Sequence, residues 1–124
     1  MSHTVTIKTQ FLDEKAIAAT CKEMGLPAPE MGEHSLYANS GQRIKGIAVK
    51  LPNWNYPLVI DPKTGQASYD NYGGAWGDQS HLNRFTQLYA VNKATLEAKK
   101  KGHMVLRTMQ PNGSIRLSIT GRSL

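Results

Sequence analysis

The longest stretch of regular hydrophobic spacing lies between residues 79 and 101 and predicts a long helix. Its apolar stripe recurs at intervals of three and four residues, through Leu82, Phe85, Tyr89, Asn92 and Leu96. Side chains with this spacing share one face of a helix. Asp78 is placed to cap the first turn, and Gly102 can adopt the left-handed conformation that ends a helix.

A shorter helix is predicted over residues 14–24, where Asp13 can act as the N-cap and Gly25 ends the pattern. Its apolar stripe contains Ile17, Cys21 and Met24. Before it, apolar and polar residues alternate over 5–11, which is typical of a half-buried strand.

The remaining apolar runs are short and predict five more strands, at 44–51, 58–61, 66–71, 103–110 and 114–120. Residues 30–43 are predicted to form a loop, with a short strand near 35–38. The element order is therefore β-α-β-β-β-α-β-β. We expect one α+β domain over residues 1–124, with a mainly antiparallel sheet and both helices packed on one face.

Pro111-Asn112-Gly113 predicts a tight turn between the last two strands, because Asn-Gly favours hairpin turns. A two-residue loop at Asn112-Gly113 would place Met109 opposite Arg116 and Leu106 opposite Ile119. The predicted inner face is Met104, Leu106, Thr108, Ile115, Leu117 and Ile119. The predicted outer face is Val105, Arg107, Met109, Arg116, Ser118 and Thr120.

Composition narrows the classes of protein. The chain has 124 residues and a net charge of +6, which permits an anionic partner such as nucleic acid or an acidic protein surface. No apolar run approaches the roughly 20 residues that span a bilayer, so we expect no membrane partner. The single cysteine excludes an internal disulfide and suits a reducing compartment. We therefore expect a cytoplasmic protein, or its equivalent in the plastid stroma.

Residues with catalytic or metal-binding chemistry are sparse. Cys21 lies on the apolar stripe of the first helix, where a buried structural thiol is expected rather than a nucleophile. The four histidines, His3, His34, His81 and His103, show no metal-ligand spacing. We predict no catalytic residues, no metal and no cofactor, although a site assembled only in three dimensions stays open.

Two groups of residues are candidates for contact with a partner. Trp54 and Tyr56 lie at a predicted turn, where they could anchor a partner or fold back over the core, and the sequence leaves both readings open. Arg107, Met109 and Arg116 fall on the predicted outer face of the last hairpin. Together with Lys8 of the first strand they could form a basic sheet face, and a solvated face without a partner is the alternative.

Three stretches resemble one family of small proteins. They are Met1-Ser2-His3-x-x-x-Ile7-Lys8-Thr9-Gln10, Leu82-Asn83-x-Phe85-x-Gln87-x-Tyr89-Ala90, and the close from Glu97-Ala98 through Gly102 to Asn112-Gly113-Ser114-Ile115-Arg116-Leu117. The family is the uncharacterised hypothetical chloroplast reading frame thirty-five, encoded in cyanobacteria, some algal plastids and scattered other bacteria. Its members often carry an acidic, tryptophan-containing stretch before the long helix, and residues 70–77 occupy that place here with less acid.

The resemblance implies a partner or adaptor role and no catalytic mechanism. No catalytic residues are assigned to the family, and its genes often lie beside one for an AAA-type ATPase. The polar positions that match the family are His3, Lys8, Gln10, Asn83, Gln87 and Tyr89.

Three functions follow from these observations. The leading one is a non-enzymatic binding or adaptor protein in a protein complex, with an AAA-type ATPase as the partner that the resemblance implies. The first alternative is a nucleic-acid-binding module that uses a basic sheet face. The second is an enzyme with a site built from His3, Asn83, Gln87 and Tyr89. The sequence does not predict an oligomeric state.

Overall fold

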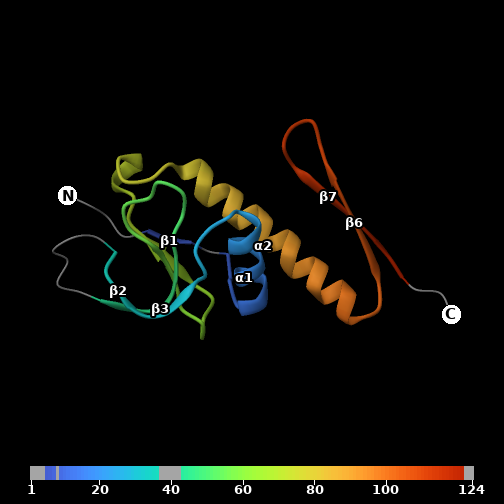
Figure 1. Cartoon of the computed structure of the whole chain (residues 1–124), viewed down its shortest axis with the longest axis horizontal. Coiled ribbons are helices and arrows are strands. Elements are labelled where there is room, and N and C mark those ends of the chain that lie inside the picture. Colours follow the sequence, from blue (N-terminus) through green and yellow to red (C-terminus); the bar gives the residue numbers. More distant parts are fainter. Residues whose placement is uncertain (1–4, 8, 37–42, 122–124) are drawn as a thin grey trace.

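The computed structural model describes residues 5–7, 9–36 and 43–121, and it confirms the predicted α+β class. Figure 1 shows a sheet at one end of a long helix, a short helix beside the middle of the long helix, and a separate hairpin beside its C-terminal half. The strands are β1 Val5–Ile7, β2 Glu30–His34, β3 Ile44–Val49, β4 Leu58–Ile60, β5 Ala67–Tyr69, β6 Met104–Met109 and β7 Ile115–Thr120. The helices are α1 Glu14–Glu23, the 3-10 turn η1 Tyr72–Gly74, and α2 Gln79–Lys100.

The main sheet has five antiparallel strands in the order β1-β5-β4-β3-β2. Its centre is apolar, because β4 is fully buried and Ile47 of β3 lies opposite Ile60 of β4. Gly46 of β3 has no room for a side chain, since a Cβ there would overlap the Ile60 carbonyl oxygen. Side chains of both helices pack against this sheet in one hydrophobic core.

The core joins the sheet to the two helices through a small aromatic cluster. Phe11 is fully buried, and its ring centroid lies 4.7 Å from that of Tyr89 and 5.7 Å from that of Phe85. The Tyr89 hydroxyl accepts a hydrogen bond of 3.1 Å from the Asp13 backbone N–H, at the start of α1. This contact fixes the N-terminus of α1 against the middle of α2.

The predicted helix ends are confirmed. Asp13 accepts a bond from the Ala16 N–H, and Asp78 accepts one of 2.9 Å from the Ser80 N–H. Gly25 and Gly102 follow the two helices with φ of 70° and 77°. Local capping chemistry therefore sets where both helices begin and end.

The long helix α2 has two buried sides rather than one wide stripe. Leu82, Phe85 and Tyr89 belong to the main core. Leu88, Val91 and Ala98 are also buried but lie outside that cluster. Val91 and Ala98 follow Gln87 at helical spacing, and Gln87 contacts the C-terminal hairpin. The second side therefore supports the hairpin.

Three expectations for the first half of the chain differ from the structure in detail. Residues 30–34 form strand β2, which pairs with β3 and places Met31 opposite Ile47, whereas a loop is predicted there. Strand β1 ends at Ile7 rather than at residue 11. The predicted short strand near 35–38 is not formed at residues 35 and 36, and residues 37 and 38 lie outside the described ranges. The chain therefore contains seven strands, one more than the sequence indicates, and they form two sheets.

The predicted register of the last hairpin is wrong by one residue. Met109 lies opposite Ile115, and Leu106 lies opposite Ser118. The loop has three residues, with the Gly113 N–H bonded to the Gln110 carbonyl and Gly113 in the left-handed region at φ 88°. Pro111 explains the difference, because a two-residue loop would need it as a pairing position and it has no N–H to donate.

Candidate protein-binding surface

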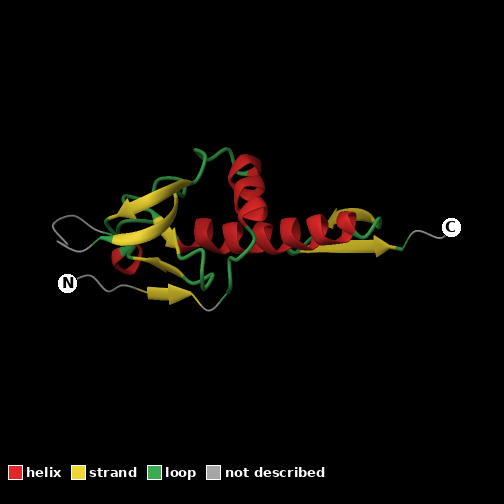
Figure 2. Cartoon of the chain, turned by 90° about the horizontal axis from the view of Figure 1, so that it is seen from below, coloured by secondary structure: helices red, strands yellow, loops and turns green. Residues whose placement is uncertain are grey.

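The C-terminal hairpin β6–β7 is a sheet of its own. Figures 1 and 2 both place it beside the C-terminal half of α2, far from the five-stranded sheet. Strand β1, at Val5–Ile7, belongs to the other sheet, and Lys8, which is expected to share a basic face with the hairpin, lies outside the described residues. The hairpin is therefore a separate two-stranded sheet that packs against α2.

Two polar contacts hold the hairpin against the helices. At its turn, the Gln87 side-chain amide donates a bond of 3.1 Å to the Gly113 carbonyl. In the middle of β6, Arg107 Nη1 lies 2.7 Å from Glu23 Oε2 of α1. The hairpin is thus tied to α2 at one point and to α1 at another.

Asn92 connects these elements into one network. Its Nδ2 donates to Thr20 Oγ1 at 3.0 Å and to Glu23 Oε1 at 3.3 Å. Its Oδ1 accepts from Arg107 Nη2 at 3.4 Å. Asn92 is the one polar member of the predicted apolar stripe, and its position between α1 and β6 explains that departure.

The hydrogen bonds of Arg107 identify the face of the hairpin that packs on the helices. Residues directly opposite in an antiparallel pair share a face, so Arg107 faces the same way as Val105, Met109, Ile115, Leu117 and Ile119. Val105, Ile115 and Leu117 are half-buried, as expected for a face against α2. The other face, which we call the open hairpin face, consists of Met104, Leu106, Thr108, Arg116, Ser118 and Thr120.

The open hairpin face leaves large apolar side chains in solvent. Met104 is 71% exposed and Leu106 is 65% exposed. Of the seven large hydrophobic side chains exposed in the described part of the chain, these two lie on the open hairpin face and two more, Met109 and Ile119, lie on the other face of the hairpin. A concentration of this kind on one element is typical of a contact surface, whereas scattered single residues are not.

The residues predicted to form a basic outer face are separated by the observed register. Arg107 and Met109 lie on the helix-facing side, and Arg116 lies on the open side opposite Thr108. Arg107 is also paired with Glu23. The predicted two-residue loop places Met104 and Leu106 on an inner face, whereas both are exposed. The signal that could have found them is Pro111, because it disfavours the two-residue loop.

Trp54 folds back against strand β5 and the start of α2. Its ring meets Tyr69 edge-on with centroids 5.4 Å apart, and its Nε1 donates a bond of 3.0 Å to the Asp78 carbonyl. Tyr56 is half-buried and packs against Trp76, with ring centroids 5.2 Å apart. Of the two readings, the folded-back one describes Trp54.

Among the polar positions that the expected family resemblance singles out, those that the structure describes do not meet in one place. His3 and Lys8 lie outside the described residues, and Gln10 is exposed in a loop. Asn83 accepts a bond from Gln79 within α2, Gln87 holds the hairpin turn, and the buried Tyr89 bonds to Asp13. The three described α2 positions thus contact three different parts of the chain.

A thiol, that of Cys21, and a carboxyl group, that of Asp70, are buried in the N-terminal body, which comprises β1 to β5 with α1. Burial raises the pKa of the Cys21 thiol to about 11, so the predicted structural thiol is protonated at neutral pH. Asp70 is 1% exposed; its Oδ1 accepts from the Tyr72 N–H, and Oδ2 has no hydrogen-bond partner within the described ranges. Tyr72 has φ 50°, a strained value for an aromatic residue, so this loop holds both strain and an unpaired acceptor.

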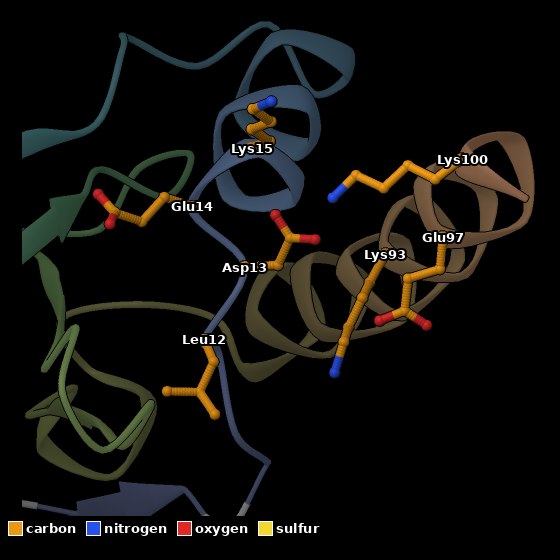
Figure 3. Close-up of a pocket in the computed structure, with 7 residues that line it drawn as sticks. All are labelled: Leu12, Asp13, Glu14, Lys15, Lys93, Glu97 and Lys100. Carbon is orange, nitrogen blue, oxygen red and sulfur yellow. The ribbon is translucent and has the colours of Figure 1, made fainter.

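An open hollow of about 390 Å³ lies between the start of α1 and the second half of α2. Figure 3 shows Asp13 and Lys100 directed toward this gap, while Glu14 points away from α2. Its lining carries three lysines and three carboxylates, and Asp13 already caps α1. The charges balance within the protein, so the hollow selects no class of charged ligand.

Among the residues placed in the structure, no three His, Cys, Asp or Glu side chains are arranged to hold a metal ion. Neither of the helices described has the length and apolar character needed to cross a bilayer. Comparison with protein-family models, with curated proteins and with solved structures gave no match for this chain.

Proposed function

We propose that the protein is a non-enzymatic binding or adaptor domain that engages another protein through the open hairpin face. The carrying observation is that Met104 and Leu106 stand exposed side by side on a hairpin that polar contacts hold in place. Burying two such side chains in a complex stabilises it by about 1.5–3 kcal/mol each before the costs of association. The partner that the family resemblance indicates, an AAA-type ATPase, stays a prediction.

Two features of the hairpin support this role. β6 and β7 pair only with each other, so both outer edges lack a partner strand in the described part of the chain. An isolated two-stranded hairpin is at best marginally stable in water. A binding role gives a reason for keeping such an element ordered and displayed on the end of a helix.

A nucleic-acid-binding module is the second candidate, and charge is the observation that favours it. Residues 79–124 contain eight Lys or Arg and one acidic residue, whereas residues 1–78 contain seven and eight. Helix α2 and the residues after it therefore carry the whole net positive charge of the chain. A phosphate-binding role requires affinity that falls steeply with salt, because bound cations release counterions from the nucleic acid.

The test is an affinity capture from native lysate with the wild-type chain, Leu106→Ser and Leu12→Ser, each at low and high salt. Leu12 is 46% exposed on the body of the protein and serves as the matched control. We expect a defined protein to be retained at high salt by wild type and Leu12→Ser and lost from Leu106→Ser. Retention by all three would contradict the proposal, and nucleic acid held only at low salt would favour the second candidate.

A further inference from the structure

We infer that the partner surface that meets the open hairpin face is an acidic, amphipathic protein segment, with apolar side chains at its centre and carboxylates around them. This inference rests on the proposed function and names the chemistry of the partner. Two features carry it: the charge around Met104 and Leu106, and the composition of the face itself.

The apolar pair is bordered by positive charge. Arg116 lies on the open hairpin face, two positions along β7 from Ser118, which pairs with Leu106. At the other end, Lys99, Lys100 and Lys101 directly precede β6, and the Lys101 Cα is at most about 11 Å from that of Met104 along the chain. Glu97 is the one acidic residue in 79–124. Arg116 therefore shares the face of the apolar pair, and the three lysines end the helix from which β6 starts, with Lys100 and Lys101 lining hollows beside α2.

Arg116 and the three lysines form no ion pair in the part of the chain that the structure describes. Within the described ranges the one ion pair is that of Arg107 with Glu23, which lies on the helix-facing side. The three lysines also complement the dipole at the C-terminus of α2, but that effect does not account for Arg116. Complementary charge at an interface speeds association and selects among partners, so a surface with carboxylates matches this border.

The composition of the face argues against the other anionic partners. Residues 103–121 contain no Phe, Tyr or Trp, so the hairpin lacks the aromatic rings on which single-stranded bases stack. The same absence disfavours a membrane surface, where Trp and Phe commonly anchor amphipathic elements. Thr108, Ser118 and Thr120 also interrupt the apolar area. A second copy docked hairpin to hairpin would bring like charges together.

The test joins capture to zero-length carbodiimide cross-linking, which links a lysine amine directly to a carboxylate. The chains compared are wild type, Leu106→Ser, the charge variant Lys99→Gln/Lys100→Gln/Lys101→Gln/Arg116→Gln, and a control, Lys15→Gln/Lys22→Gln/Lys63→Gln. All three control lysines are exposed on the N-terminal body. Circular dichroism melts establish that each variant is folded before capture.

We expect a Leu106-dependent protein to be cross-linked from Lys99, Lys100 or Lys101 to its Asp or Glu side chains. The charge variant should capture it about tenfold less at low salt, since rim charges contribute modestly and are screened by salt. The control should capture it normally. That combination supports an acidic partner segment.

The remaining outcomes overturn the inference in separable ways. A Leu106-dependent protein that is neither cross-linked nor affected by the charge variant would leave the proposed function standing and remove the acidic chemistry. If no protein is captured in a way that depends on Leu106, the proposed function itself is contradicted. Displacement by a single-stranded oligonucleotide or by phosphatidylserine vesicles, or cross-links to Glu30 or Glu33 of a second copy, would assign the surface to another partner.

Discussion

The guanidinium of Arg107 in the C-terminal hairpin lies 2.7 Å from the carboxylate of Glu23 in the first helix, although 84 residues separate them in the chain. Side-chain exposure is 36% for Arg107 and 32% for Glu23. This pair, with Asn92 between the two residues, fixes the side of the hairpin that meets the helices. The opposite side, with Met104 and Leu106, is thereby left exposed.

A double-mutant cycle with Arg107→Met and Glu23→Gln measures this relationship. We expect a coupling free energy of about 0.5–1 kcal/mol, because ion pairs that are partly exposed are screened by water. Hydrogen exchange of the β6 and β7 amides should quicken in both single variants. Arg116→Met is the matched control, since Arg116 lies on the open face. Unchanged exchange in the hairpin would show that the pair does not hold it.

Gly77 should not tolerate a side chain. A Cβ at this position would overlap the Trp54 indole, which packs over Tyr69. We expect Gly77→Ala to lower the free energy of unfolding by about 1–3 kcal/mol, as for other overpacked sites, measured by urea denaturation. Adding Trp54→Leu should recover part of the loss, because it removes the overlapping ring. Equal losses with and without the ring would mean that the overlap is not the cause.

The Cys21 thiol should react slowly in the folded protein. Burial raises its pKa to about 11, and the thiolate is the reactive form. At pH 8 we expect labelling by a disulfide reagent at least about 100-fold slower than for a free cysteine with pKa about 8.5. Unfolding in urea should restore the ordinary rate. Prompt labelling of the folded protein would contradict the buried position of Cys21 in α1.

The cap at the start of α2 should make stability depend on pH. The hydrogen bond from the Ser80 N–H lowers the pKa of Asp78, so the folded state favours the charged carboxylate. Its contribution is full above the ordinary aspartate pKa of about 3.9 and is lost as pH falls through the lower native value. The difference in melting temperature between wild type and Asp78→Ala should therefore narrow toward pH 3. A constant difference from pH 7 to pH 3 would rule out this role of the charge.

The helices could be predicted because their signals are local. Capping by Asp13 and Asp78 and termination by Gly25 and Gly102 depend on a few neighbouring residues. Strand β2 could not be predicted in the same way. Its one large apolar residue is Met31, and Glu30–His34 becomes a strand because β3 offers an edge to pair with.

The candidate surface shows a different limit of sequence reasoning. A shift of one residue in register moved Met104 and Leu106 from the expected inner face to solvent and placed Arg107 against Glu23. Alternation in β6 cannot settle this, because Met and Leu on one side alternate with Val, Arg and Met on the other. Pro111 indicates the register, and the pairing of Arg107 with distant Glu23 and Asn92 shows which side faces the helices. The positive charge after residue 78, in contrast, is readable from the sequence.

Methionine oxidation followed by mass spectrometry tests the central claim most directly, because two methionines of similar exposure lie on different surfaces. Met104 on the open hairpin face is 71% exposed, and Met31 on strand β2 is 58% exposed. Both should oxidise readily with peroxide in the free protein. In the complex with the captured partner, we expect Met104 to be protected while Met31 oxidises at its free rate. Protection of Met31 with continued oxidation of Met104 would place the partner elsewhere and contradict the account.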